Sequence, residues 1–464
     1  MSQLDPGVSP DRAAAADPSQ GRLRRTLSLP QIVFLGLAYM APLAVFDTFG
    51  IVADITDGHV PLSYLVILVA VVITALSYAR IVRYFPRAGS AYTYTREAIN
   101  PHLGFLVGWA ATLDYLLLPM INALLSSIYM TVAFPDVPAW VWIVSTIVLC
   151  TVLNLVGVKL AANVNVALVI IQLTVAIAFV VLTVKSVIEG ANGSTFSWEP
   201  FYSSSVELSA IGAGAAVLAL SFLGFDAVTT LAEEANHPQR DIPRAIMIIV
   251  AVAGVFFVTV TYVMQALFPD VSAVGDIVGA SPEIAQYIGG AAFQAIFIGG
   301  YMTAVYGCGI TQQMSAARLL YAMGRDGALP QRPFCALNKA GVPSGNVILI
   351  GLLASTAVFL DLYQAASLIN FGAFVAFAFV NLSVIFTYVR FLREGRGHSR
   401  LGYVVLPALG VVANVWLWLS LESSAKLVGL LWVALGLGFL LWRTRLFRAP
   451  APALSGPDLS GPDL

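Results

Sequence analysis

The chain carries successive apolar runs of roughly 17 to 25 residues, the length of helix that spans about 30 Å of hydrocarbon, and this feature constrains its fold most. Only 11% of its 464 residues are charged, whereas about a quarter are charged in a soluble domain. The charges are therefore too few to cover a soluble surface of this size. Strand-like alternation of apolar and polar residues is absent, so a transmembrane barrel is not expected. The sequence predicts an all-α polytopic membrane protein.

We predict twelve transmembrane helices within a membrane domain over residues 26–446. The first apolar run is too long for a secretory signal, and further runs follow it. The flanking tails, 1–25 and 447–464, are rich in small and polar residues and are predicted to be disordered. The predicted spans start near Gln31, Leu62, His102, Ala139, Asn163, Ser209, Ala245, Ala291, Asn346, Ala365, Leu401 and Leu427.

The distribution of positive charge predicts the orientation of these spans. With both tails on one side, all 24 Lys and Arg residues except Lys185 and Lys426 fall on that side. The positive-inside rule then places both ends of the chain in the cytoplasm. Acids gather on the opposite face, where they would attract cations, although exposed loops can simply be polar. They are Asp54, Asp57, Asp136, Glu189, Glu199, Glu207, Asp270, Asp276 and Glu283.

Cysteine and histidine are too scattered to form a metal or disulfide cluster. Cys150 and Cys308 lie in apolar runs and Cys335 in a polar loop. The histidines, His59, His102, His237 and His398, lie in or beside predicted loops. We therefore expect no cofactor and no metal, and the net charge of −1 gives no indication of nucleic acid.

Several acids lie within apolar spans. Asp47 lies in span 1, Asp114 in span 3 and Asp226 in span 6, while Glu233 and Glu234 end span 6. A charge at the bilayer centre costs about 2.5–3.5 kcal/mol, so such residues usually mark a pathway or a site. No Lys or Arg lies at comparable depth, which suggests a cationic ligand or protons as the partner. The alternative is that each acid is neutral, or hydrogen-bonded to backbone amides.

Spans 1 and 6 share a local pattern. A Phe-Asp pair occurs in each, at 46–47 and 225–226, and a helix-breaking residue precedes it, Pro42 or Gly224. Interrupted spans at matching positions of two halves point to the midplane site of a transporter. Ammonium groups bind over aromatic faces, although most aromatic residues in membranes only pack. The nearby aromatic residues are Tyr39, Phe46, Trp109, Tyr115, Phe222 and Phe225.

Three stretches resemble motifs of the amino acid–polyamine–organocation superfamily. They are Gly224–Glu234 with the following Pro238–Ala245, Phe85–Tyr92, and Ser315–Gly327. The resemblance covers roughly Arg22 to Arg445. It implies a five-plus-five inverted-repeat fold with broken helices 1 and 6.

Other fragments resemble the bacterial putrescine importers more narrowly. They are Phe46–Val52, Asp57–Pro61, Leu113–Leu116, Leu118–Asn122 and Ile369–Ala373. Amino acid carriers generally do not share these fragments. The resemblance implies import of an aliphatic diamine together with protons.

Departures from amino acid carriers favour the same interpretation. Those carriers usually have Gly-Ser-Gly at the break in span 1, where bare amides hold the substrate carboxylate. The matching residues here are Pro42–Ala44, and proline has no amide hydrogen. Some members carry a span-5 lysine in place of a coupling sodium ion, and Gln172 matches it here. Because glutamine carries no proton near neutral pH, a coupling proton must be on a carboxyl, and the coupling residue stays open.

We therefore hypothesise a secondary active transporter in the bacterial plasma membrane that imports putrescine, with protons, by alternating access. An amino acid permease or an amine exchanger of the same superfamily is the alternative. An enzyme would need a metal cluster or a nucleophile–base pair, a channel repeated pore loops, and a sensor a soluble domain; we find none of these. Candidate substrate-binding residues are Asp47, Phe46, Tyr39, Asp114, Tyr115, Phe222, Phe225 and Asp226. Candidate coupling or gating residues are Asp226, Glu233, Glu234 and Gln172.

Overall fold

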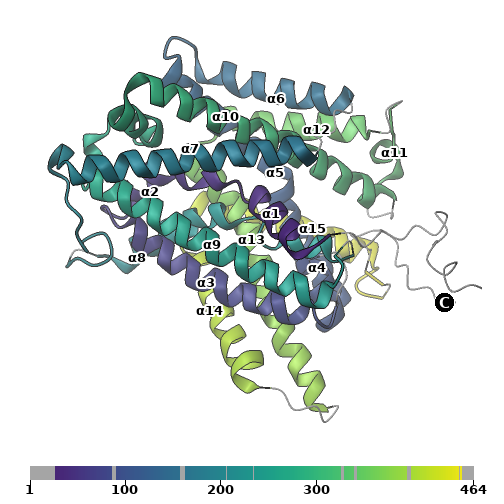
Figure 1. Ribbon diagram of the computed structural model, residues 1–464. Helices are drawn as coiled ribbons and strands as arrows, with labels where there is room; N and C mark the ends of the chain where they lie inside the picture. The colour runs from purple at the N-terminus through teal and green to yellow at the C-terminus, as the bar shows by residue number, and fades with distance from the viewer. Residues whose placement is uncertain are drawn as a thin grey trace, which may run out of the picture.

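The computed structural model describes residues 27–85, 90–156, 162–204, 206–233, 235–325, 329–338, 342–393, 399–448 and 450–451. These residues form a helical bundle (Figure 1). The predicted tails lie outside the described residues, apart from 447–448 and 450–451. Glu234 also lies outside them, and so does part of each of the other two superfamily motifs, at 86–89 and 326–327.

The first half of the chain supplies spans 1 to 6. Its helices are α1 (Leu29–Tyr39), the 3₁₀ turn η2 (Pro42–Phe46), α2 (Phe49–Ile55), α3 (Val60–Ile81), α4 (Ser90–Ala98), α5 (Pro101–Ala133), α6 (Ala139–Val156), α7 (Ala162–Ile188), η3 (Ala191–Gly193), α8 (Leu208–Leu218), η4 (Ala219–Phe222) and η5 (Ala227–Glu233). Span 1 consists of α1, η2 and α2, and span 6 consists of α8, η4 and η5. Spans 2 to 5 are α3, α5, α6 and α7.

The second half supplies the remaining spans. Its helices are α9 (Pro238–Leu267), η6 (Val271–Ala273), α10 (Ala280–Arg325), α11 (Gln331–Phe334), α12 (Ser344–Ala354), η7 (Ser355–Phe359), α13 (Leu362–Arg393), the π-helical turn η8 (Leu401–Val405), α14 (Leu406–Leu419) and α15 (Ser423–Arg443). α10 is kinked at Gly290, where φ is 68°. The predicted start of span 8, Ala291, follows this kink directly.

Eleven segments of the described chain are long and apolar enough to cross a membrane. The predicted ninth span is present but shorter, as the apolar segment Ser344–Phe359 formed by α12 and η7. Its last turn is a 3₁₀ helix, and the chain reverses at Leu360 into α13. The polytopic helical fold is confirmed, whereas the count of twelve full-length spans is not.

Spans 1 and 6 are both interrupted near their middle, as the sequence predicts. In span 1, α1 ends at Tyr39 and Ala41 adopts a φ of 50° before the 3₁₀ turn. In span 6, Leu223 is extended and Gly224 adopts a φ of 103°. A positive φ is costly for a residue with a side chain but not for glycine. The two breaks therefore lie at Ala41 and at Gly224.

Helix packing follows a two-fold pattern that relates spans 1–5 to spans 6–10. α3 packs against α9 and α5 against α10, so spans 2 and 3 contact their counterparts, spans 7 and 8. α1 packs against α9 as α8 packs against α3, and α5 packs against α13 as α10 packs against α7. When spans 1–5 are exchanged with spans 6–10, each of these helix contacts is replaced by another contact named in this paragraph. Because five is odd, the second set crosses the membrane in the opposite direction, as an inverted repeat requires.

The break in span 1 lies inside the bundle, where Met40, Leu43 and Phe46 are buried, whereas Phe34 and Leu35 of α1 are exposed. In Figure 1, α1 lies near the centre of the view, and α6, α12 and α14 lie toward the margins. Large apolar side chains on the marginal helices are exposed, among them Val148, Leu352 and Val412. Apolar side chains that face outward suit contact with lipid. The breaks in spans 1 and 6 can therefore form a site inside the bundle.

Candidate functional site

A cavity of about 80 Å³ lies where the two breaks face α5 and α10. The lining residues include the ends of α1 and η4, the start of η5, and the middle of both long helices. No Lys or Arg is among those that the structure describes. The acids and phenols that line it are Tyr39, Asp47, Asp114, Tyr115, Asp226 and Tyr301.

Asp47 forms one end of the acidic lining. It follows η2 directly and is 7% exposed. The Tyr301 hydroxyl, from α10, donates a hydrogen bond to Oδ1 of Asp47. The ring of Tyr301 stacks on Tyr129 of α5, with centroids 3.7 Å apart. Asp47 is therefore held in one orientation by a neutral donor, and no cation is built in beside it among the described residues.

Asp114 and Asp226 form the other acidic group. They come from α5 and from the break in span 6, and they are close enough for their charges to interact. The Tyr78 hydroxyl donates to Oδ2 of Asp226 at 3.3 Å. Oδ1 of Asp114 is buried and has no hydrogen-bond partner among the described residues. A buried acceptor without a partner is costly, so this oxygen is a strong candidate for a ligand contact.

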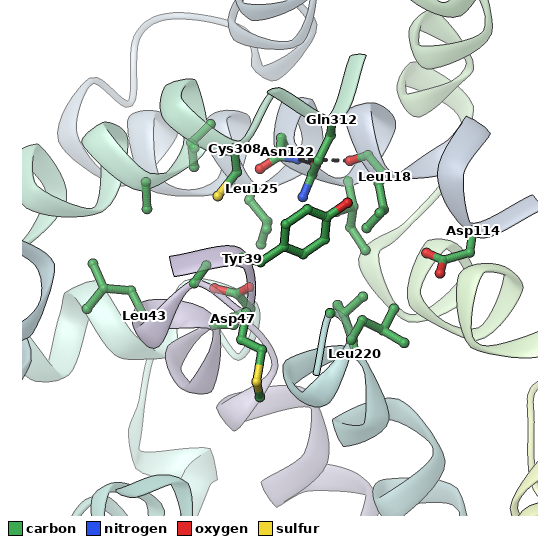
Figure 2. A pocket seen from close by; sticks show the side chains of 18 of the residues that line it. Tyr39, Leu43, Asp47, Asp114, Leu118, Asn122, Leu125, Leu220, Cys308 and Gln312 are labelled. Atoms are coloured by element: carbon green, nitrogen blue, oxygen red, sulfur yellow. Dashed lines mark hydrogen bonds between the residues drawn. The ribbon is translucent and has the colours of Figure 1, made fainter. Parts of the chain in front are cut away.

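Tyr39 lies between the two acidic groups. Figure 2 shows its ring between Asp47 and Asp114, reaching toward Gln312. The ring is positioned by span 6, because a Cβ at Gly224 would meet Cδ1 of Tyr39 at 2.5 Å. The break in span 6 thus needs glycine both for its positive φ and for the space occupied by Tyr39.

An amide pair closes one wall of the cavity. Nδ2 of Asn122 donates to Leu118 O at 2.9 Å and also to Oε1 of Gln312. The pair joins α5 to α10 across the cavity (Figure 2). The structure thus adds polar residues that sequence analysis did not select, namely Tyr301, Asn122 and Gln312. A polar side chain in the middle of an apolar span was the only signal that could have identified them.

The backbone at the break in span 1 offers few free donors. Pro42 has no amide hydrogen, and the Ala44 amide donates to Ala41 O at 2.8 Å. Leu43 lines the cavity. The Ala44 carbonyl is also paired, because Ser221 donates to Ala44 O at 3.3 Å. This backbone is poorly suited to hold a carboxylate.

Three predicted aromatic residues do not line the cavity. Phe46, Phe222 and Phe225 are at most 2% exposed. Phe46 packs against Phe179 and Phe297, with centroids 4.7 and 5.1 Å away. Phe222 and Phe225 pack against rings of other helices, including those of Tyr64, Phe257, Tyr78 and Phe377. They belong to the packed core around the site, whereas Tyr39 and Tyr115 line the cavity.

Of the candidate coupling residues, Asp226 lines the acidic cavity, whereas Gln172 does not. Gln172 lines a second cavity of about 420 Å³, toward the side of the bundle where α1 begins. This cavity shares six lining residues with the first, among them Tyr39, Tyr115 and Gln312. Glu233 ends η5, and the structure describes its backbone only, whereas Glu234 lies outside the described residues.

Comparison with known proteins agrees with this architecture. Residues 31–439 match the amino acid permease family. The chain is 42% identical to the low-affinity putrescine importer PlaP of Escherichia coli, over 94% of this chain and 97% of that protein. It is 27% identical to the branched-chain amino acid permease BcaP of Lactococcus lactis, over 89% of this chain and 93% of that protein. A methylthioribose transporter of Bacillus subtilis is also 27% identical, over 92% of this chain and 95% of that protein.

These relatives, together with the eleven apolar helices, support a multi-pass protein of the bacterial inner membrane. The superfamily resemblance noted from the motifs in spans 6 and 8 is confirmed by the match over residues 31–439. The chain belongs to the amino acid permease family.

Proposed function

We propose that the protein is a secondary active transporter that imports a small aliphatic diamine, with putrescine as its substrate. It is a carrier and not an enzyme. The observation that carries the proposal is the cavity at the two helix breaks, lined by Asp47, Asp114 and Asp226 and by no described basic residue. The 42% identity to a protein named as a putrescine importer supports the same substrate class.

The size and arrangement of the cavity suit a short diamine. At roughly 10–15 Å³ for each water-sized group, its volume of about 80 Å³ accommodates a chain of several such groups. Extended putrescine places its ammonium groups roughly 6 Å apart, from single-bond lengths. One ammonium binds at Asp47, and the other binds at Asp114 and Asp226. Tyr39 lies between them and contacts the methylene chain.

The same geometry disfavours amino acid substrates. A carboxylate would meet acids at both ends of the cavity. The break in span 1 offers it no compensating donor, because Pro42 has no amide hydrogen and the Ala44 amide already donates to Ala41 O. An unpaired buried carboxylate is strongly unfavourable. Ornithine, which differs from putrescine only by this group, should therefore be a poor competitor. An amino acid permease or an amine exchanger remains the second candidate, since the 27% identical relatives include a permease of branched-chain amino acids.

Protons supply the driving force in this proposal. Gln172 carries no proton near neutral pH, so the proton is carried by the cavity carboxyls. A bound ammonium favours the ionised form of a nearby carboxyl, so substrate and proton are linked at the same groups. Both ends of the chain lie in the cytoplasm, as the positions of Lys and Arg indicate.

Uptake of labelled putrescine into proteoliposomes tests the proposal. We expect uptake that collapses when a protonophore dissipates the proton gradient and that needs no sodium. Unlabelled cadaverine, spermidine, ornithine and arginine serve as competitors. Equal competition by ornithine and putrescine would favour an amino acid carrier, and sodium-dependent uptake would refute proton coupling.

A further inference from the structure

The second cavity contains a buried polar group with no assigned role. Gln172 of α7 is 5% exposed, and its Oε1 atom is buried without a hydrogen-bond partner among the described residues. Gln172 lines this cavity but not the first one. An unpaired buried carbonyl loses its hydrogen bond to water without compensation. A ligand that donates a hydrogen bond would remove this cost.

The hydroxyls near Gln172 also face the cavity as acceptors. Thr303 donates to Gly300 O at 2.6 Å, and Thr311 donates to Gly307 O at 2.9 Å. Ser315 donates to Thr311 O at 2.9 Å. A hydroxyl has a single hydrogen to donate, so each of these oxygens has only lone pairs left for a ligand. Together with Gln172, they form a wall that accepts hydrogen bonds.

The wall is neutral, and the second cavity adjoins the acidic one. No carboxylate, ammonium or guanidinium is among the described residues that line the second cavity. Tyr39, Tyr115, Cys308 and Gln312 line both cavities. A linear molecule that passes these shared residues would reach from the first cavity into the second.

We propose that the second cavity is a subsite for the third ammonium of a linear triamine, with Gln172 Oε1 as its main acceptor. This inference rests on the proposed diamine site. The aminobutyl part of spermidine lies in the first cavity and binds the acids as putrescine does. Its aminopropyl arm, roughly 5 Å between nitrogens from single-bond lengths, passes Tyr39 and Tyr115 and donates to Gln172. An ammonium carries only donors, which matches the acceptor wall.

Displacement of labelled putrescine from the purified full-length protein tests the subsite. Spermidine is compared with N-propylputrescine, which lacks only the terminal ammonium. In the wild-type protein we expect spermidine to bind about tenfold more tightly, as for a hydrogen bond to a charged group. In Gln172→Leu the two ligands should bind about equally, because the acceptor is gone. Using the ratio of the two affinities cancels general effects of the substitution on the fold.

Two further variants sharpen the test. Gln172→Glu places a carboxylate at the subsite and should raise the ratio above the wild-type value. Gln286→Leu, on an exposed part of α10, should leave it unchanged. Equal binding of the two ligands to the wild-type protein would overturn the subsite, and so would a ratio that neither Gln172 variant alters. Failure of putrescine itself to bind would instead overturn the proposed function.

Discussion

Tyr301 of α10 donates its hydroxyl hydrogen to Asp47 at the break in span 1, and no Lys or Arg lines the cavity around this pair among the described residues. The bond joins span 1, in the first repeat, to span 8, in the second repeat. A neutral donor orients the carboxylate but leaves its charge available. Asp47 can therefore bind an ammonium that a built-in cation would otherwise exclude.

Tyr301→Phe should weaken putrescine binding, because Asp47 then loses the group that orients it. Hydrogen bonds to charged groups are worth about 1.5–3 kcal/mol, so we expect KM to rise about tenfold. Tyr129→Phe is the comparison variant, since it removes the hydroxyl of the ring that stacks on Tyr301 and leaves the bond from Tyr301 to Asp47 in place. Uptake kinetics of the two variants decide the matter. Equal effects of the two variants would mean that the bond from Tyr301 to Asp47 has no special role in binding.

The acids should differ in the kinetic constant that they affect. We predict that Asp47→Asn chiefly raises KM for putrescine, by about one to two decades, because an ammonium contact is lost. Asp226→Asn should chiefly lower turnover, because Asp226 follows the Gly224 break and is bonded to Tyr78 of α3. Asp136→Asn, in an exposed loop, is the control. Near-normal putrescine affinity in Asp47→Asn, with binding measured apart from transport, would rule out this acid as an ammonium ligand.

Gly224→Ala should impair transport by disturbing the break in span 6. The new methyl group would lie 2.5 Å from Tyr39, at a residue whose φ is 103°. A side chain in such a conformation costs about 1–3 kcal/mol, and Tyr39 would have to move. We expect uptake to fall about fivefold or more by this estimate. Gly299→Ala, whose methyl group would meet no described atom within 4 Å, should transport normally. Normal uptake by Gly224→Ala would show that the break tolerates a side chain.

Putrescine binding should release protons and weaken as the pH falls. The sign follows because an ammonium favours ionised carboxylates, so protons compete with the diamine at Asp47, Asp114 and Asp226. Calorimetry in two buffers that differ in ionisation enthalpy measures the number of protons released. An identical heat of binding in both buffers would mean that the carboxyls are already ionised, and the proton carrier would have to be sought elsewhere.

The sequence predicted the broken spans and their acids because these features are local. Pro42 and Gly224 disfavour helix by their own chemistry, and an acid in an apolar run is costly wherever the run folds. Whether the aromatic ring next to each acid faces the cavity or the core was less predictable. Phe46 and Phe225 directly precede the acids, but neither ring lines the acidic cavity. Both rings pack in the core.

Contacts between distant spans could not be predicted from one sequence. The approach of Asp114 to Asp226, and of Tyr301 to Asp47, depends on how α5 and α10 cross the broken helices. The amide pair Asn122–Gln312 depends on the same crossing. The sequence analysis placed the acids in their spans, but the arrangement of Asp114 and Asp226 around one cavity became visible only in the assembled bundle.

The central claim is that acids at both ends of one cavity hold the two ammonium groups of a diamine. Calorimetric titration of the purified protein with putrescine and with n-butylamine, which lacks one of the two ammonium groups, tests it most directly. A buried charge-assisted contact is worth about 1.5–3 kcal/mol, so butylamine should bind about ten to a hundred times more weakly. Binding of butylamine within about twofold of putrescine would contradict the two-ended site.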